Sequence, residues 1–534
     1  MLRVPRLPWR GLRRLGQLVF LALFLWLFRR TELSASADLP TNVNLWFRID
    51  PLVNLAATLG AAAVITLAWP ALVLIALTVL LGRFFCGWVC PLGTLLDLAH
   101  RLFRPLARRA NRLALARLHH LRPARFVILV IVLLAALMGL PLVGLVDPFS
   151  LLVRAMTFTL DPAWFNIATD ANTWMADHGP RFLSDHSEAV YQFLRAHALP
   201  FKHASYAMGG VSLAILGGLF GLEFVGRRFW CRYLCPLGAL LGVCSRRSVL
   251  RRLPSRACGN CKSTHPCAAS CRMAAFDGQG RFSPECCDLC MDCIAQCSQR
   301  VAALAVGLPR APAAPVGLSR RVLIGSVTAG IAIPTLWRAA RAIGGTPVDP
   351  HLIRPPGVAD DRHFLDVCVR CGACMKVCPT GALQPSALDA GIGGLFAPRI
   401  VPRMGYCEYA CTLCGQICPT GAIPSLLEEA KVRVSIGIAE FDRARCLPWA
   451  QNEPCICCEE HCPIPEKAIK LIPADVVNAQ GEKVTIERPY VDRALCIGCG
   501  ICENKCPIDS PAGIRVWHKA AAPQAPAASQ RAGA

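Results

Sequence analysis

The sequence has few charged residues and lacks the short motifs that bind nucleotides or c-type haem. Charged side chains make up only 17% of the 534 residues, whereas hydrophobic ones make up 54%. This balance is typical of a membrane protein rather than a soluble enzyme. No Gly-x-Gly-x-x-Gly run, phosphate-binding loop or Cys-x-x-Cys-His motif occurs, so nucleotide, nicotinamide and c-type haem sites have no support. We assign no catalytic residue.

Acidic residues are also scarce, since 35 Asp and Glu face 57 Lys and Arg, for a net charge of +22. The arginines lie beside apolar runs, which favours anchoring by the positive-inside rule over nucleic-acid binding. We therefore expect membrane lipid, and no nucleic acid, as a partner.

Long apolar runs fill the first 226 residues, and each resembles a membrane span. They cover residues 15–28, 52–81, 126–146 and 206–225. About 20 apolar residues cross the hydrocarbon layer, so we expect an α-helical membrane domain of four spans. No small-residue cleavage site follows the first run, which is interpreted as an anchor. Arginines in 83–122 and 227–252 place both segments in the cytoplasm.

A fifth, weaker apolar stretch follows an Ala/Pro-rich linker and starts at Arg320-Arg321. It resembles a twin-arginine export signal, with Ala342 at a possible cleavage site; the alternative is a fifth span. Either reading places the remainder outside the cytoplasm. The predicted domains are a membrane domain (1–226), a two-cluster region (227–300), a linker with the fifth segment (301–343), a four-cluster domain (344–517) and a disordered tail (518–534).

Cysteine, by contrast, is abundant and clustered. The run Cys368-x2-Cys371-x2-Cys374-x3-Cys378-Pro379 and a second run ending at Cys506 match the bacterial ferredoxin pattern, in which three cysteines bind one [4Fe–4S] cluster and the fourth binds its neighbour. We predict four clusters in the C-terminal domain, held by Cys368, Cys371, Cys374 with Cys418; Cys407, Cys411, Cys414 with Cys378; Cys446, Cys455, Cys458 with Cys506; and Cys496, Cys499, Cys502 with Cys462.

The region 227–300 predicts two more clusters by the same exchange. Their ligands are Cys258, Cys261, Cys267 with Cys297, and Cys287, Cys290, Cys293 with Cys271. Arg272 and Ser298 replace the usual proline here. Cys286 competes with Cys287 as a ligand, and Cys457 is spare in the C-terminal domain. Zinc is the alternative metal for all of these groups, although it prefers two short cysteine pairs that lie farther apart.

Two further cysteine pairs follow the second and fourth apolar runs. Cys86-x3-Cys90 and Cys231-x3-Cys235 both precede Pro-Leu-Gly and follow an arginine-aromatic stretch. The x3 spacing predicts that each pair shares one helix face. The repeat indicates two related halves that bring four thiols to one membrane edge. They are candidates for a metal, a further cluster or a redox dithiol, and buried inert cysteine is the alternative.

On these motifs, residues 10–300 resemble the NapH-type membrane subunit of quinol dehydrogenases, and residues 318–515 resemble the NapG/MauM-type ferredoxins. The fold class is therefore multi-domain, with helical spans and two ferredoxin-like α+β [4Fe–4S] regions. The resemblance implies a bacterial inner-membrane electron carrier, a possible quinol dehydrogenase component. It would oxidise quinol from the quinone pool and reduce a periplasmic reductase or cytochrome, such as nitrate reductase.

Three ionisable residues near the spans are candidates for handling quinol protons, namely Glu223, Asp97 and His203. Each is also read as an ordinary interfacial residue. The rival function is assembly or maintenance of a respiratory copper enzyme, a NosR- or CcoG-like role in which the membrane-edge cysteines bind or reduce copper.

Overall fold

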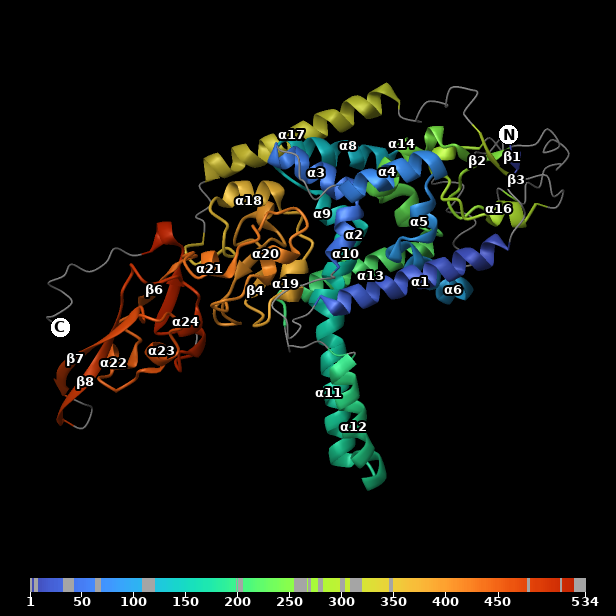
Figure 1. Cartoon of the computed structure of the whole chain (residues 1–534). Coiled ribbons are helices and arrows are strands. Elements are labelled where there is room, and N and C mark those ends of the chain that lie inside the picture. Colours follow the sequence, from blue (N-terminus) through green and yellow to red (C-terminus); the bar gives the residue numbers. More distant parts are fainter. Residues whose placement is uncertain are drawn as a thin grey trace.

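The computed structural model consists of an elongated helical bundle with a cysteine-rich region at each end (Figure 1). It describes residues 2–3, 8–31, 43–62, 69–107, 121–197, 199, 205–253, 267, 270–276, 282–297, 303–307, 319–344, 349–477, 481–509 and 511–522. The predicted tail, 518–534, lies outside these residues from 523 onward.

Among the described residues, two helices are long and apolar enough to cross a membrane: α1 (Trp9–Arg30) and the Arg320–Ala339 part of α17 (Arg320–Gly344). The other apolar helices are shorter, at 10–17 residues, and are α3 (Pro51–Ala61), α4 (Trp69–Leu81), α8 (Ala124–Leu137) and α13 (Gly209–Val225). The expected four spans in residues 1–226 are therefore not confirmed by helix length.

The expected run 52–81 is divided because local backbone chemistry ends the helix early. Asp50 caps α3 by accepting hydrogen bonds from the backbone N–H groups of Leu52 and Val53, and Pro51 occupies the first helical position. Ala62, at φ +50°, ends α3 in the left-handed conformation. Asp147 and Pro148 repeat this start in α10 (Pro148–Ala155). Hydropathy alone did not predict the helix end at Ala62 inside the run.

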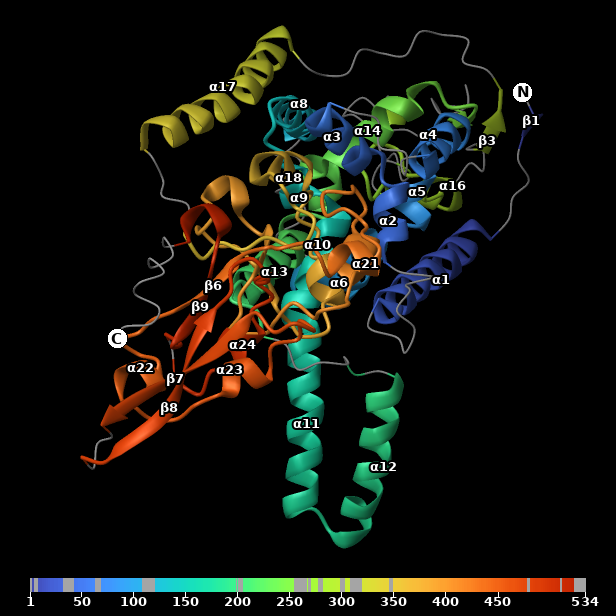
Figure 2. The same cartoon turned by 60° about the vertical axis from the view of Figure 1, so that its left-hand side comes forward.

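The two Asp-Pro turns also follow short helices. The remaining elements of the bundle are α2 (Asn44–Ile49), α5 (Phe84–Trp88), α6 (Pro91–Ala107), α9 (Val143–Val146), the π-helical turns η3 (Met156–Leu160) and η4 (Trp230–Leu234), α14 (Pro236–Cys244) and η5 (Ser245–Arg247). A hairpin of α11 (Asp161–His178) and α12 (Arg181–His197) extends downward, away from the bundle, in both views (Figures 1 and 2).

The first ferredoxin region, which we expected at 227–300, is joined by the N-terminus of the chain. Strand β3 (Ala303–Val306) pairs antiparallel with both β2 (Leu250–Leu253) and β1 (Leu2–Arg3). The short helices η7 (Pro284–Cys286) and α16 (Asp292–Ala295) complete the described part. Cys258 and Cys261 lie outside the described residues.

The C-terminal cysteine-rich domain consists of short helices and two-stranded antiparallel sheets. Its sheets pair β4 (Leu383–Pro385) with β5 (Pro398–Ile400), β6 (Ile438–Phe441) with β9 (Ile514–Trp517), and β7 (Ile469–Val477) with β8 (Lys483–Val491). Its helices are α18 (Asp361–Val367), α19 (Ala373–Val377), η8 (Ile392–Gly394), α20 (Leu413–Ile417), α21 (Glu428–Lys431), α22 (Leu447–Ala450), α23 (Cys457–Glu460), α24 (Ile501–Lys505) and η9 (Lys519–Ala521).

Glycines allow this domain to pack directly on the helical bundle. A Cβ at Gly60 would lie 2.2 Å from the carbonyl oxygen of Asp366, and one at Gly144 would lie 1.7 Å from that of Val369. Buried Arg370 donates from Nη2 to the Gly393 carbonyl at 2.7 Å, within its own domain, and from Nη1 to the Pro141 carbonyl of the bundle. The backbone contact holds the start of the first cysteine group against the bundle.

Replacing Gly144 with alanine should loosen this contact, because the methyl group would collide with backbone that cannot rotate away. We expect a loss of about 1–3 kcal/mol in the free energy of unfolding. Thermal unfolding measures the loss of stability, and hydrogen exchange at residues 366–370 shows whether the contact has loosened. Gly217→Ala is the matched control, since nothing lies within 4 Å of a Cβ there. Equal behaviour of the two variants would contradict the packing role of Gly144.

Candidate metal centres

The structure brings the cysteines of the C-terminal domain into four groups, with the exchange of fourth cysteines that the sequence predicts. Group A is Cys368, Cys371, Cys374 and Cys418, and group B is Cys407, Cys411, Cys414 and Cys378. Burial raises the pKa of Cys374, and the thiolates of Cys371, Cys368 and Cys418 raise it further. Burial likewise raises the pKa of Cys414, followed by Cys407, Cys378 and Cys411.

The second pair of groups also exchanges its fourth cysteines. Group C is Cys496, Cys499, Cys502 and Cys462, and group D is Cys446, Cys455, Cys458 and Cys506. Burial raises the pKa of Cys458 to about 12, and Cys446, Cys455 and Cys506 all contribute. Burial raises the pKa of Cys499 to about 12, with contributions from Cys496, Cys407 and Cys462.

Contacts between the groups place them in the order A, B, C, D. Cys374 of group A lies within electrostatic range of Cys414 of group B. The Cys407 backbone N–H of group B donates to the Cys499 carbonyl of group C at 2.8 Å. Cys502 of group C lies within electrostatic range of Cys458 of group D. The chain order of the last two groups is thus reversed in space, which the sequence did not predict.

The donor set of these groups suits iron–sulfur clusters. Thiols with raised pKa values stay protonated at neutral pH unless a metal replaces the proton. Four buried or partly buried sulfurs per group, supplied by tight loops, match the ligand set of a [4Fe–4S] cluster. No three His, Cys, Asp or Glu side chains of the described residues surround a position for a single metal ion.

The spare and competing cysteines occupy other positions. The Cys457 sulfur donates to the Lys505 carbonyl at 3.1 Å. The buried Cys286 sulfur accepts from Arg125 Nη2 at 3.1 Å, so it faces the bundle. Burial raises the pKa of Cys287, and Cys293 and Cys271 contribute; with Cys290, these form group E, as the sequence predicts. Cys267 and Cys297 are described, but their predicted partners Cys258 and Cys261 are not.

The two Cys-x3-Cys pairs come together at the end of the bundle beside group E. Cys235 lies within electrostatic range of Cys231, Cys86 and Cys90, and these four form the membrane-edge group. The prediction that each pair shares one helix face is wrong. A helix ends between the two cysteines, and Pro236 starts α14, with the Cys235 sulfur accepting from the Gly238 backbone N–H at 3.3 Å. Proline at the first helical position explains the break.

A buried ion network joins the membrane-edge group to group E. Arg228 lies 2.9 Å from Asp97 and 3.1 Å from Asp288, and Arg272 lies 2.5 Å and 2.8 Å from the same two residues. Arg228 Nη1 also donates to the Cys86 carbonyl at 3.0 Å. Arg272, which replaces the usual proline after Cys271, therefore docks the first ferredoxin region on the bundle.

Aromatic side chains fill the space between the membrane-edge group and group A. Phe85, next to Cys86, contacts Phe149 at 6.0 Å between ring centroids, and Phe149 contacts Trp46 at 5.6 Å. Trp46 then contacts Phe24, which stacks on Phe28. Lys376, two residues after Cys374, lies 4.4 Å from the Phe28 ring centroid. These contacts give a continuous packed path between the two sites.

The candidates for quinol protons differ in their surroundings. Asp97 belongs to the ion network, where burial opposes ionisation but Arg228 and Arg272 hold the pKa of its carboxyl well below the usual range. This makes Asp97 a structural anion. Glu223 is buried, accepts from the Arg228 backbone N–H at 2.9 Å and lies 3.6 Å from His100. His203 lies outside the described residues.

Taken together, cysteine groups in ferredoxin-like loops define a multi-centre iron–sulfur protein of the electron-transfer class. Family models agree. A 4Fe-4S binding domain model matches residues 62–109 and 208–256, a 4Fe-4S dicluster domain matches 367–422, and another 4Fe-4S binding domain matches 489–511. The first model covers both Cys-x3-Cys pairs, which sequence reasoning had left open.

The chain belongs to a family of ferredoxin-type proteins. It is 37% identical to the methylamine utilization ferredoxin-type protein MauM of Paracoccus denitrificans, over 35% of this chain and 78% of the relative. It is 31% identical to the ferredoxin-type protein NapG of Escherichia coli, over 35% and 78%. The regulatory protein NosR of Pseudomonas aeruginosa is 26% identical over 55% of this chain and 33% of its own length. No solved structure matches the chain.

Proposed function

We propose that the chain carries electrons from membrane quinol through groups A, B, C and D to a periplasmic redox protein, such as nitrate reductase. The observation that carries this proposal is the spatial order of the groups. Group A packs on the helical bundle through Arg370 and Lys376, whereas group D lies at the far end of the series. Electrons that enter at the bundle would leave near group D.

We place the protein in the bacterial inner membrane with its two cysteine-rich regions on opposite sides. The first ferredoxin region and the C-terminal domain lie at opposite ends of the helices in Figure 1, which supports a cytoplasmic and a periplasmic location for them. In this proposal residues 10–300 act as a NapH-type module fused to the ferredoxin. The membrane-edge group holds a further cluster, supported by the family match over both pairs.

The segment at Arg320 acts as a fifth span in this proposal. A Cβ at Gly330 would lie 2.9 Å from Leu134 Cβ, so α17 approaches α8 closely through a small residue, as membrane helices commonly do. A signal peptide that is removed near Ala342 would not need to pack closely against α8.

Electron entry is tested with the full chain, purified without oxygen in lipid nanodiscs. A soluble quinol should reduce its clusters, giving EPR signals of reduced [4Fe–4S] centres. The same protein that carries its full complement of iron, and yet stays oxidised with excess quinol, would rule out the proposed donor.

The four membrane-edge thiols favour a second function, maturation or maintenance of a respiratory copper enzyme. In that case Cys86, Cys90, Cys231 and Cys235 would bind or reduce copper. A deletion strain distinguishes the two functions. Loss of copper from an oxidase or nitrous oxide reductase supports maturation, whereas full copper loading with slow electron supply supports the carrier.

A further inference from the structure

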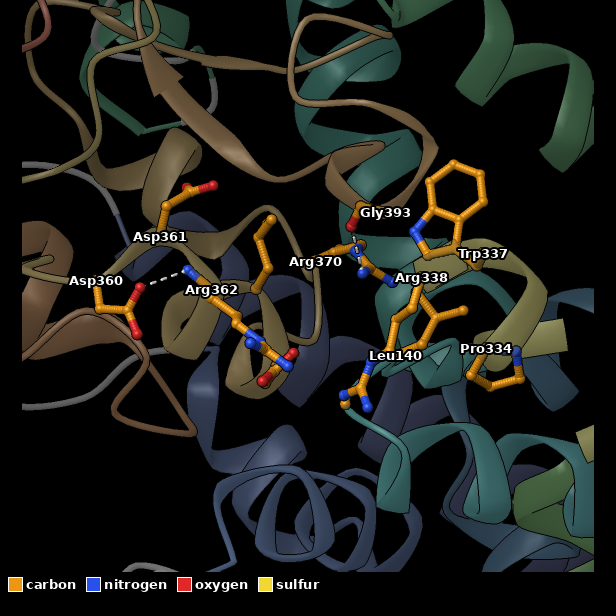
Figure 3. Close-up of a pocket in the computed structure, with 12 residues that line it drawn as sticks. Leu140, Pro334, Trp337, Arg338, Asp360, Asp361, Arg362, Arg370 and Gly393 are labelled. Carbon is orange, nitrogen blue, oxygen red and sulfur yellow. Dashed lines mark hydrogen bonds between the residues drawn. The ribbon is translucent and has the colours of Figure 1, made fainter. Parts of the chain in front are cut away.

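A cavity of about 560 Å³ opens where the bundle meets the C-terminal domain. It is lined by the end of α17, the turn after α8, helix α18 and the loop at Gly393 (Figure 3). This volume is in the range of small-molecule binding sites. Leu365 and Arg370 line it from either side of Cys368, so one wall of the cavity belongs to the loop that forms group A.

The cavity has an apolar side and a polar side. Leu140, Pro334 and Trp337 come from the apolar helices α8 and α17 or the turn that follows, and Asp366 and Arg362 come from the cysteine-rich domain. A molecule bound here would enter from the lipid-facing helices and present its polar atoms to the domain that holds group A.

The charges around the cavity balance. Three arginines and three aspartates line it, and these are Arg338, Arg362, Arg370, Asp360, Asp361 and Asp366. Gly139, at φ +71°, leaves room for one pair of opposite charges, Arg338 and Asp366. A Cβ at residue 139 would lie 2.5 Å from Arg338 Nη2 and 2.9 Å from Asp366 Oδ1. A balanced lining favours a neutral ligand with polar atoms over an anionic lipid phosphate.

Two buried N–H donors of the lining have no partner among the described residues. They are Trp337 Nε1 and Arg370 Nε, and these residues lie on either side of Gly393 in Figure 3. A buried unpaired donor costs free energy, which an acceptor oxygen on a ligand would recover. The ligand should therefore carry oxygen acceptors, together with an apolar part that faces Leu140, Pro334 and Trp337.

We propose that this cavity binds the head group of a membrane quinol. A quinol is neutral, lipid-soluble and carries two ring oxygens, which fit the apolar entrance, the balanced charges and the unpaired donors. The assignment rests on the proposed function and gives it a location, at a site built jointly from the fifth span and the C-terminal domain.

An azido-quinone photolabel, used on the full chain in nanodiscs, tests the location. We expect label in peptides that contain residues 334–338 or 360–370, and excess decylubiquinone should prevent it. Trp337→Ala should reduce labelling about tenfold, the effect of one lost contact worth about 1.4 kcal/mol. Leu336→Ala is the control, because Leu336 is the adjacent residue and is 69% exposed. Labelling of other peptides, or equal labelling of the Trp337→Ala and Leu336→Ala variants, would contradict a quinol site in this cavity.

Iron content and cluster EPR of each variant show that it is folded and separate this site from the proposed function. Quinol-reduced clusters with label elsewhere refute the cavity and leave the carrier function standing. Label in the cavity without cluster reduction supports the cavity and refutes quinol oxidation. If the cavity is not labelled and the clusters are not reduced, both the cavity site and the carrier function are refuted.

Discussion

Replacing Cys414 with alanine is expected to stop electrons at group A. Among the described residues, group B alone contacts both group A, through Cys374, and group C, through Cys499. Without it, quinol should still reduce group A, while groups C and D stay oxidised. We expect turnover with an electron acceptor to fall about a hundredfold, or roughly 2.7 kcal/mol of activation free energy. Freeze-quench EPR after mixing with quinol measures it.

Cys457→Ala is the matched control for this variant. Cys457 lies in the same domain and donates to the Lys505 carbonyl, but it belongs to none of the four groups. Its removal should leave turnover and iron content unchanged. If the Cys414 variant transferred electrons as fast as the Cys457 variant, the series A, B, C, D would not be the route.

Replacing Arg228 with leucine is expected to have the second large effect. The guanidinium is fully buried and lies between Asp97 and Asp288. Its loss leaves two buried carboxylates to share Arg272, and breaking such a pair costs about 3–5 kcal/mol. We expect a lower melting temperature and faster proteolysis of the first ferredoxin region.

Arg227→Leu is the control, because Arg227 is partly exposed and lies 3.9 Å from Asp292. The pH dependence gives a further check. The folded-state pKa of Asp97 is depressed, so its contribution is present above its unfolded pKa and is lost as pH falls through the folded value. The difference between wild type and Arg228→Leu should stay constant from about pH 5 to 8. A difference that vanishes within that window would contradict a charged network.

The cysteine groups were the most predictable part of the molecule. A loop with x2, x2 and x3 spacing determines locally which thiols converge, and the exchange between paired loops follows from the ferredoxin pattern. Even the irregular first gap before Cys455 did not disturb the grouping with Cys506. The order of the groups was not predictable, because it depends on contacts such as Cys407 with Cys499, far apart in sequence.

The apolar helices were less predictable, because hydropathy does not record turns within apolar runs. Ala62 ends a helix inside the predicted span 52–81, and Gly139 turns the chain after α8, inside the predicted span 126–146. The motif Asp-Pro at residues 50 and 147 was a usable signal for helix starts. The helix break within each Cys-x3-Cys pair was signalled in the same way by the proline that follows.

The ion network was invisible in the sequence. Asp97 and Arg228 are 131 residues apart and both looked like ordinary charges near the ends of spans. Only the absence of proline after Cys271 hinted that Arg272 serves another purpose. Its two ionic partners, Asp97 and Asp288, lie 175 and 16 residues away along the chain, and no local pattern connects them.

Metal and sulfide analysis, combined with EPR on the full chain purified without oxygen, tests the central claim most directly. The cysteine groups predict about 24 iron ions for six clusters, with more if the membrane-edge group holds one. They also predict magnetic interactions between neighbouring reduced clusters. A folded chain that contains zinc or no metal in groups A to D would contradict the account.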